Sequence, residues 1–485
     1  MKKSTCRCNK LTCLIALIIF TASSCSEKLV EEPKSIAVEV FYNTPQEVET
    51  AVNAIYSPLR NKIPEYVATH EAHSDLMYGR GSWEPLSLYQ GFNDANINRV
   101  VDFWNMFYVA IRNANLVIQN APKGTNISQA DLDRYLAEAK FLRAFSYFNL
   151  VRNWSAVPLR TEANMIQRDL PKSSVSAIYD FIIADLLVAE TLLPDNQVDV
   201  GRPTKWSAKT CLADVYLQLA RYSEAASKSN EVIQSNKYSL IRVNNKADIQ
   251  NNIFGPTIVT SPEEIFYFKY SRLPNLGNYL LFISNHPITG LFKFGGAYAI
   301  HGNATNPIYL NWNGNDLRKS LFDKINFGLG ANTLVSSKWV DRDAISTFGA
   351  GNDYPVYRYA DVLLIYAEAA ARAAGNVSAA SLEALNKVRR RGYAFNPAVP
   401  SAVDFKPADF SGTSFVDSVI KERGYEFVYE GKRWLDLKRT GKAAELILAA
   451  KGKAIAAKHL LWPIPLSEMN YNKALNPASD QNPGY

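Results

Sequence analysis

Small alanine residues alternate with large apolar and aromatic side chains at helical spacing in several separate stretches of this chain. Between residues 131 and 152, for example, Ala139, Leu142 and Phe145 recur at the spacing that places them on one face of a helix. Small residues next to large ones let neighbouring helices approach closely, as they do in stacked helix pairs. The sequence therefore predicts a mainly α fold built on a tetratricopeptide-like helical repeat scaffold.

Capping residues and prolines mark the ends of the expected helices. Thr44 and Pro45 suit an N-cap and a first helical turn, whereas Pro158 and Pro194 follow helices as stops. Residues 205–219 with 222–235, and 360–373 with 378–390, are expected to form two helix pairs of the repeat. The other expected helices are 44–60, about 103–119, 131–152 and 174–193.

Between about residues 242 and 355 the composition changes. Gly, Asn and Pro become dense, and short extended runs such as 265–270 occur. A structureless stretch of this length is unusual in a compact domain. We expect an irregular subdomain with short strands and ordered loops, packed on helical repeats at about 41–240 and 356–440. A second loop-rich stretch is expected from His70 to Ile97, and binding surfaces concentrate in loops on a rigid scaffold.

The N-terminus has the layout of a secretory signal. Basic residues precede an apolar run from Leu11 to Phe20, and small residues then lead to Cys25. This predicts a lipoprotein signal peptide at 1–24, lipidation at Cys25 and a polar tether at 25–40; a plain signal peptide cut nearby is the alternative. No later segment is long and apolar enough to span a membrane, so the lipid would be the only membrane anchor.

Charge and cysteine content exclude several classes of function. The net charge of +7 falls to +3 once the basic residues of the signal are removed, which is too weak to indicate a nucleic-acid partner. Cys211 is the one cysteine after Cys25, so a single chain forms neither a disulfide nor a cysteine metal site. We expect an inert core thiol there, and no cofactor.

Two charged patterns resemble active sites. Glu422, Glu426 and Glu430 follow at helical spacing, but glycosidase carboxylates face each other across a sugar. A structural ion-pair network is the favoured interpretation. His70 and His73, in the sequence His-Glu-Ala-His, are one residue short of the H-E-x-x-H zinc motif. The favoured interpretation is a solvated or ligand-facing loop, and no metal site is predicted.

Aromatic side chains in the expected loops are the better candidates for binding. Sugar rings have apolar C–H faces that stack on Trp and Tyr, while polar side chains bind the hydroxyl groups. Tryptophans in helical segments, Trp104, Trp154, Trp206 and Trp434, are expected to pack in the core. The predicted ligand-binding residues are Asp75, Trp83, Tyr89 and Asn93 in the first loop stretch, and Tyr298, His301, Tyr309 and Trp312 in the second.

Four segments, together with the lipidation signal, resemble the SusD/RagB family in the expected order. The most recognisable is IKERGYEFVYEGKRWLDLKRTG at 420–441. The others are AEAKFLRAFSYFNLVRNWSAVPL (137–159), YRYADVLLIYAEAAARAAG followed by ALNKVRRRG (357–375 and 384–392), and LLWPIPLSEMNYNKALNPASDQNPGY (460–485). The resemblance implies a single SusD-like domain at 41–485.

The resemblance also implies a function. It indicates a non-catalytic lipoprotein of the outer membrane, facing the cell exterior, that captures an oligosaccharide and delivers it to a SusC-like TonB-dependent barrel. Three alternatives stay open: a non-sugar nutrient such as a peptide, a secreted glycoside hydrolase, and a scaffold that binds proteins in the groove of its repeats.

Overall fold

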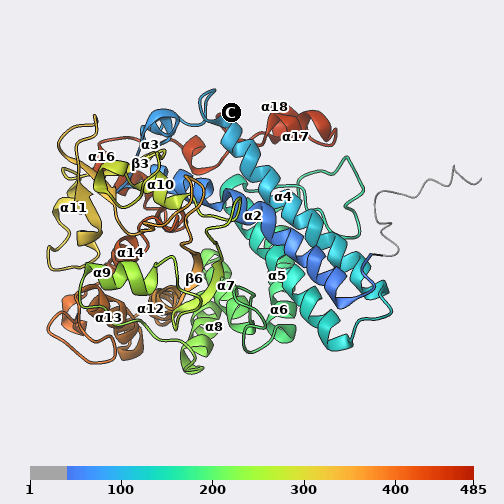
Figure 1. Cartoon of the computed structure of the whole chain (residues 1–485), viewed down its shortest axis with the longest axis horizontal. Helices are drawn as coiled ribbons and strands as arrows, with labels where there is room; N and C mark the ends of the chain where they lie inside the picture. Colours follow the sequence, from blue (N-terminus) through green and yellow to red (C-terminus); the bar gives the residue numbers. More distant parts are fainter. Residues whose placement is uncertain (1–40) are drawn as a thin grey trace, which may run out of the picture.

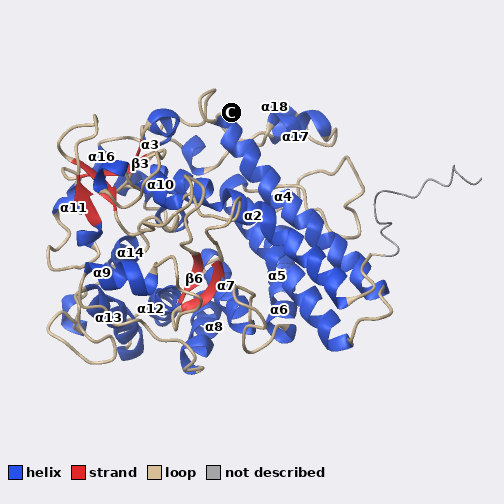
Figure 2. Cartoon of the chain, in the orientation of Figure 1, coloured by secondary structure: helices blue, strands red, loops and turns tan. Residues whose placement is uncertain are grey.

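The computed structural model describes residues 41–485, so the predicted signal peptide, Cys25 and tether lie outside the described residues. Helices dominate it, and the strands are few and short (Figure 2). The mainly α fold is thus confirmed. The principal helices are α2 (Pro45–His73), α4 (Ile97–Asn120), α5 (Gln129–Trp154), α6 (Val175–Leu192), α7 (Lys205–Gln218), α8 (Tyr222–Gln234), α12 (Tyr359–Ala374), α13 (Ala379–Gly392), α14 (Ser414–Glu426), α15 (Arg433–Arg439) and α16 (Ala443–Lys451).

These helices pack in a continuous series, as expected of a helical repeat. Helices α2, α4, α5 and α6 lie side by side, and α7, α8, α12 and α13 continue the series across the molecule (Figure 1). Buried side chains from both halves of the chain join one large apolar core. Because each helix buries its face against the next, the array forms a rigid scaffold for the loops.

The first helix is longer than the sequence predicts. Thr44 caps it as expected, but α2 continues through Pro58 and Pro64 to His73 instead of ending near residue 60. A proline removes one helical hydrogen bond, yet the buried face continues with Ile63 and Val67 after the first proline. Burial of this face maintains the helix, and the expected loop at 70–73 is therefore wrong.

The irregular subdomain carries two small antiparallel sheets. One has the strand order β1-β3-β5-β4, formed by β1 (Tyr78–Gly79), β3 (Ile300–Asn303), β4 (Phe322–Lys324) and β5 (Thr333–Ser336). The other pairs β2 (Glu264–Phe268) with β6 (Tyr354–Arg358). Since β1 follows α2 directly and pairs with β3, the first loop stretch is joined to the second. Short helices complete this region: α3 (Glu84–Ser87), α9 (Lys246–Asp248), α10 (Leu280–Ser284) and α11 (Pro307–Leu310), with α17 (Leu466–Tyr471) and α18 (Pro477–Asp480) near the C-terminus.

A buried ion-pair network connects the helices to the irregular subdomain. Arg358 pairs with Glu430 at 2.8 Å, and Arg318 pairs with Glu426 at 2.9 Å. Burial alone would raise the pKa of Glu430, but Arg358 and Lys338 outweigh it and hold that pKa at about 2. The predicted structural network is confirmed, although α14 ends at Glu426 and Glu430 lies beyond the helix.

Candidate functional site

Stacked aromatic rings gather on the loops of the irregular subdomain. His286 stacks on Phe327, with ring centroids 4.6 Å apart and planes at 15°. Tyr279 stacks on Phe348 at 4.3 Å and 23°, and the Phe348 side chain is 57% exposed. We name this set the aromatic loop surface; its members are Arg80, Tyr279, His286, Tyr298, Phe327 and Phe348.

Tyr298 connects the His286–Phe327 stack to Phe282, whose ring in turn stacks on Tyr279 at 6.4 Å. The Tyr298 ring lies edge-on to His286 at 4.5 Å and to Phe327 at 5.5 Å, and its backbone N–H donates to the carbonyl of Phe282 at 2.8 Å. Its φ of 33° lies in the left-handed region, which a tyrosine rarely adopts. Such strain persists only where the surroundings impose it, and it concentrates at functional sites.

The Arg80 guanidinium lies 4.5 Å from the centroid of the Tyr298 ring. Its backbone N–H donates to the carbonyl of Ala299 at 2.8 Å, beside the pairing of β1 with β3. Gly79 makes the tight turn possible, because a Cβ there would lie 2.2 Å from the carbonyl oxygen of Trp83. A sheet edge and a glycine turn therefore fix this cation against the aromatic rings.

Of the predicted ligand-binding residues, Tyr298 belongs to the aromatic loop surface. His301 lies on the adjacent strand, stacked on Tyr78 at 5.9 Å. Asn93 is exposed in a turn, where its side chain accepts a hydrogen bond from the backbone N–H of Ala95. Tyr309 is half-buried, with the Lys319 amine 4.7 Å from its ring centroid. The part of these four in binding stays a prediction.

The other four predicted residues lie in the interior. Trp83 is 7% exposed, with the Arg99 guanidinium 3.8 Å from its ring centroid. Tyr89 is buried and donates its hydroxyl to the carbonyl of His73 at 2.6 Å, and Trp312 is 2% exposed. Asp75 is fully buried. We expected these four side chains to be open to a ligand because they lie in loops. That expectation is wrong, because the loops fold inward around them and complete the core.

The sequence does not predict five members of this surface: Arg80, Tyr279, His286, Phe327 and Phe348. A signal for two of them exists, since Phe327 follows Asn326 and precedes Gly328, and Phe348 follows Thr347 and precedes Gly349. A single aromatic residue between turn-forming residues has few neighbours to bury it. It is therefore a better candidate for exposure than a tryptophan in an apolar context.

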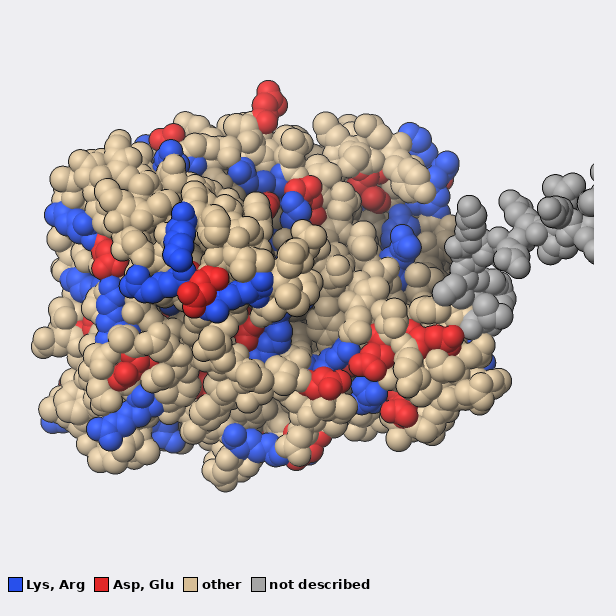
Figure 3. Space-filling model, viewed as in Figure 1, with Lys and Arg blue, Asp and Glu red and all other residues tan. Residues whose placement is uncertain are grey.

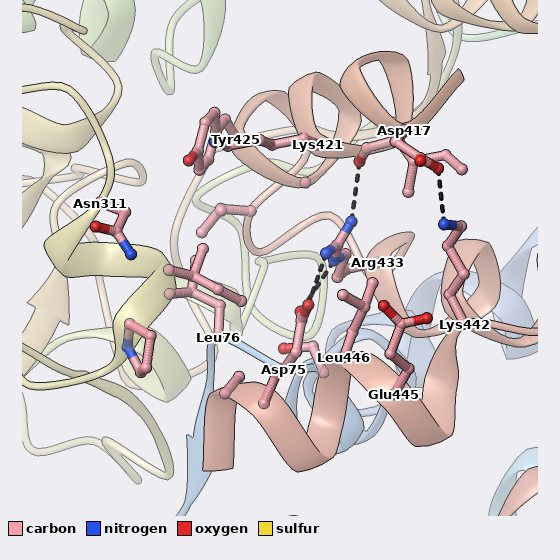
Figure 4. A pocket seen from close by; sticks show the side chains of 18 of the residues that line it. Asp75, Leu76, Asn311, Asp417, Lys421, Tyr425, Arg433, Lys442, Glu445 and Leu446 are labelled. Carbon is pink, nitrogen blue, oxygen red and sulfur yellow. Dashed lines mark hydrogen bonds and ion pairs between the residues drawn. The ribbon is translucent and has the colours of Figure 1, made fainter. Parts of the chain in front are cut away.

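A pocket of about 410 Å³ lies between the end of α2 and helices α11, α14 and α16 (Figure 4). Arg433 and Asp75 pair at 2.6 Å in it, and Lys442 pairs with Asp417 at 2.7 Å (Figure 4). Apolar side chains, including Leu76 and Leu446, form most of the remaining wall. Trp312 covers one face of the pocket's Tyr425, so the pocket lacks the open stacked rings of the aromatic loop surface.

His70 and His73 lie on the last turns of α2 and are buried. Their Nδ1 atoms contact the carbonyls of Tyr66 and Thr69 at 3.0 and 2.8 Å, within the same helix. The interpretation as a solvated or ligand-facing loop is wrong, because this turn packs into the core. Within residues 41–485, no group of three or more His, Cys, Asp or Glu side chains is placed to hold a metal ion.

Two family models match the chain. The SusD family matches residues 302–485, and a family described as starch-binding, associating with the outer membrane, matches residues 29–217. Among curated relatives, the SusD-like protein P25 of Formosa agariphila is 27% identical over 529 residues, covering 96% of this chain and 98% of the relative. The SusD-like protein P2 of the same organism is 27% identical and covers 98% and 99%.

Solved structures share the fold. A SusD superfamily protein from Parabacteroides distasonis is 25% identical with a TM-score of 0.74, covering 91% of this chain and 99% of that one. A laminarin-binding SusD-like protein is 23% identical with a TM-score of 0.74, covering 92% and 100%. The surface glycan-binding protein A of Bacteroides thetaiotaomicron, in complex with laminarihexaose, is 21% identical with a TM-score of 0.73, covering 90% and 99%.

Proposed function

Because the chain belongs to the SusD family, we propose that it is a surface lipoprotein that captures a glycan and delivers it to an outer-membrane barrel of the SusC-like, TonB-dependent kind. Two of the solved structures with this fold are described as binding laminarin or laminarihexaose. Which glycan this chain binds depends on its own side chains.

The observation that carries the proposal is the aromatic loop surface. Phe348 is 57% exposed and stacks on Tyr279, and Phe327 and Tyr298 are partly exposed on separate loops of the same subdomain. Sugar rings present C–H faces that pack on such rings, and a few polar groups nearby fix the orientation of the ligand. Arg80 and His286 supply those polar groups here.

Binding without catalysis accords with the position of the carboxylates. Hydrolysis of a glycoside uses two carboxyl groups on opposite sides of one bond. Glu422, Glu426 and Glu430, the acidic residues with the most suggestive spacing, are at most 5% exposed and paired with arginine or lysine. Two of the solved structures described above are named as binding proteins.

The location and the partner belong to the same proposal. A lipid on Cys25 would hold the protein on the outer membrane, facing the exterior, and the barrel would receive the glycan. In the part of the chain that the structure covers, every helix is too short or too polar to cross a membrane. Purification of the tagged, full-length lipoprotein from outer membranes tests the partnership, since a TonB-dependent barrel should co-purify with it.

Calorimetric titration of the mature protein, from Ser26 onward, against plant, host and microbial oligosaccharides tests the binding. We expect one class to bind, with no hydrolysis products afterwards. Phe348→Ala and Phe327→Ala should each weaken binding by roughly two- to tenfold, the loss expected for one stacking ring. Tyr471→Ala, which removes an exposed ring from α17, is the matched control and should leave the affinity unchanged.

Three results would contradict this proposal. Equal affinity for the two phenylalanine variants and the unchanged protein would remove the aromatic loop surface as the site. Hydrolysis of the bound glycan would show that the protein is an enzyme and not a capture protein. Absence of binding to every oligosaccharide of the panel, together with binding of peptides, would identify the ligand as the non-sugar nutrient that the sequence also allows.

A further inference from the structure

Within residues 41–485, Arg80 is a cation without a carboxylate partner. Its Nη1 donates to the carbonyl of Ala297 at 3.2 Å, and its guanidinium lies over the Tyr298 ring. Among residues 41–485, it makes no ion pair, although most arginines of this protein do. Burial lowers the pKa of His286, and the positive charge of Arg80 lowers it further. The charge of Arg80 therefore lies close to the stacked rings.

Arg342 is a second such cation on the same loops. It is exposed, and its Nη1 donates to the carbonyl of Gly290 at 2.8 Å. Gly290 ends a short helical turn that begins directly after His286. Lys293 follows on this loop and is exposed as well. In the part of the chain that the structure describes, neither Arg342 nor Lys293 takes part in an ion pair.

The carboxylates of this region are mostly neutralised. Asp341 and Asp343 pair with Arg272 at 2.7 and 3.5 Å. Burial and the negative charge of Glu65 raise the pKa of Tyr279, and Glu65 itself pairs with Lys62 at 3.7 Å. Glu84, whose charge acts on His301, is exposed and makes no ion pair within residues 41–485. The unpaired cations therefore exceed the unpaired carboxylates.

The space-filling view agrees with this excess. Over the loop-rich part of the face, basic side chains gather around an acidic one, while larger acidic groups lie toward the other end of the molecule (Figure 3). Unpaired cations beside a stacking surface raise the local concentration of anionic ligands and strengthen their binding.

We propose that the aromatic loop surface takes an anionic glycan, with the acid groups bound by Arg80 and Arg342 while sugar rings pack on Phe327 and Phe348. This inference rests on the proposed function and adds the substrate class to it. A guanidinium group presents a planar fork that binds the two oxygens of a carboxylate or a sulfate ester. Both kinds of acidic sugar share this chemistry.

The test compares three series of oligosaccharides of equal length by calorimetry: polygalacturonate for carboxylates, carrageenan for sulfate esters, and laminarin as the neutral series. Salt is varied from about 50 to about 500 mM, over which charge-dependent binding is screened. We expect one acidic series to bind at least tenfold more tightly than laminarin, with an affinity that falls as salt rises. The series that binds identifies the acid group.

Variants assign the effect to the two arginines. Arg342→Gln changes an exposed side chain and should weaken acidic binding severalfold, and addition of Arg80→Gln should remove most of the salt dependence. Arg342→Lys should recover part of the loss. Arg221→Gln, at an exposed arginine preceding α8, removes the same charge elsewhere and should change nothing.

Three outcomes overturn the inference. Equal binding of acidic and neutral series, without salt dependence, would leave a capture protein for neutral glycans, so that the proposed function stands. Acidic binding that survives both arginine changes would place the acid groups elsewhere. Absence of binding in all three series and in the wider panel would remove the proposed function itself.

Discussion

The indole ring of Trp312 lies parallel to the phenol ring of Tyr425, with centroids 4.2 Å apart and planes at 11°. The indole Nε1 donates to Asp316 at 2.9 Å, and Asp316 pairs in turn with Arg318 at 2.6 Å. A loop residue thus joins α14 to the buried ion-pair network. The arrangement gives Trp312 a structural role that its sequence context does not reveal.

Trp312→Ala should therefore destabilise the fold by about 3–5 kcal/mol, the usual result of removing a buried tryptophan. The free energy of unfolding, measured by urea denaturation, checks this. Glycan affinity per folded molecule should stay unchanged, because the ring is 2% exposed. A stable variant with weakened binding would return Trp312 to the ligand site.

Acid should destabilise the protein in two steps. Burial lowers the pKa of His73 from 6.5 to about 3, so only the unfolded chain takes up this proton as the pH falls from about 6.5. Burial raises the pKa of Glu430, but Arg358 and Lys338 outweigh it and lower that pKa from 4.5 to about 2. Stability from this carboxylate is present above pH 4.5 and is lost toward pH 2.

Urea midpoints measured between neutral pH and the acid limit check this dependence. His73→Gln should make the first decline shallower and leave the second in place; buried His70, whose pKa burial also lowers, contributes to the same decline. The same pH dependence in His73→Gln as in the unchanged protein between pH 7 and pH 4 would show that His73 does not differ in protonation between the folded and unfolded states.

Lys451 places its amine among the rings of Tyr78 and Tyr89, 4.8 and 5.7 Å from their centroids. Its Nζ is buried without a hydrogen-bond partner in the described part of the chain, and burial lowers its pKa from 10.5 to about 7. Since the unfolded chain holds this proton up to about pH 10.5, stability from this group should rise as the pH increases from 7.

Lys451→Met should raise the free energy of unfolding at pH 7 by about 1 kcal/mol, because it removes an unpaired buried amine. Thermal denaturation at pH 7 and pH 9 measures the effect, which should shrink at the higher pH. Lys453→Met, two residues later at an exposed position, is the control. A loss of stability in Lys451→Met alone would mean that the contacts of the ammonium with the two rings outweigh its burial.

The helical scaffold follows from local sequence. Ser174 caps α6, and Thr44 caps α2, as their hydroxyl groups and positions predict. The extension of α2 past Pro58 and Pro64 does not follow locally, because it depends on burial against helices distant in the chain. Helix starts are encoded by caps, whereas this helix end is decided by packing.

The candidate site is less predictable from sequence. Tyr298 and Trp312 both lie in loops rich in Gly and Asn, yet the structure leaves one partly exposed and buries the other. The difference arises from tertiary contacts: Arg80 and His286 surround Tyr298, while Tyr425 packs on Trp312. Composition identifies which regions carry binding residues, but exposure of each ring depends on its partners in space.

Gly79 should be essential for the position of Arg80. An alanine Cβ at this residue would lie 2.2 Å from the carbonyl oxygen and 2.5 Å from the carbonyl carbon of Trp83, and these backbone atoms cannot move aside as a flexible side chain can. The turn must therefore shift, and Arg80, the next residue, would leave the Tyr298 ring. We expect Gly79→Ala to reduce stability by about 1–3 kcal/mol, as overpacking does, and also to weaken glycan binding.

Gly314→Ala is the matched control, because its Cβ would meet no atom within 4 Å. Titration of both folded variants separates the two effects: full affinity in Gly79→Ala would show that the site does not depend on Arg80 being held in this turn.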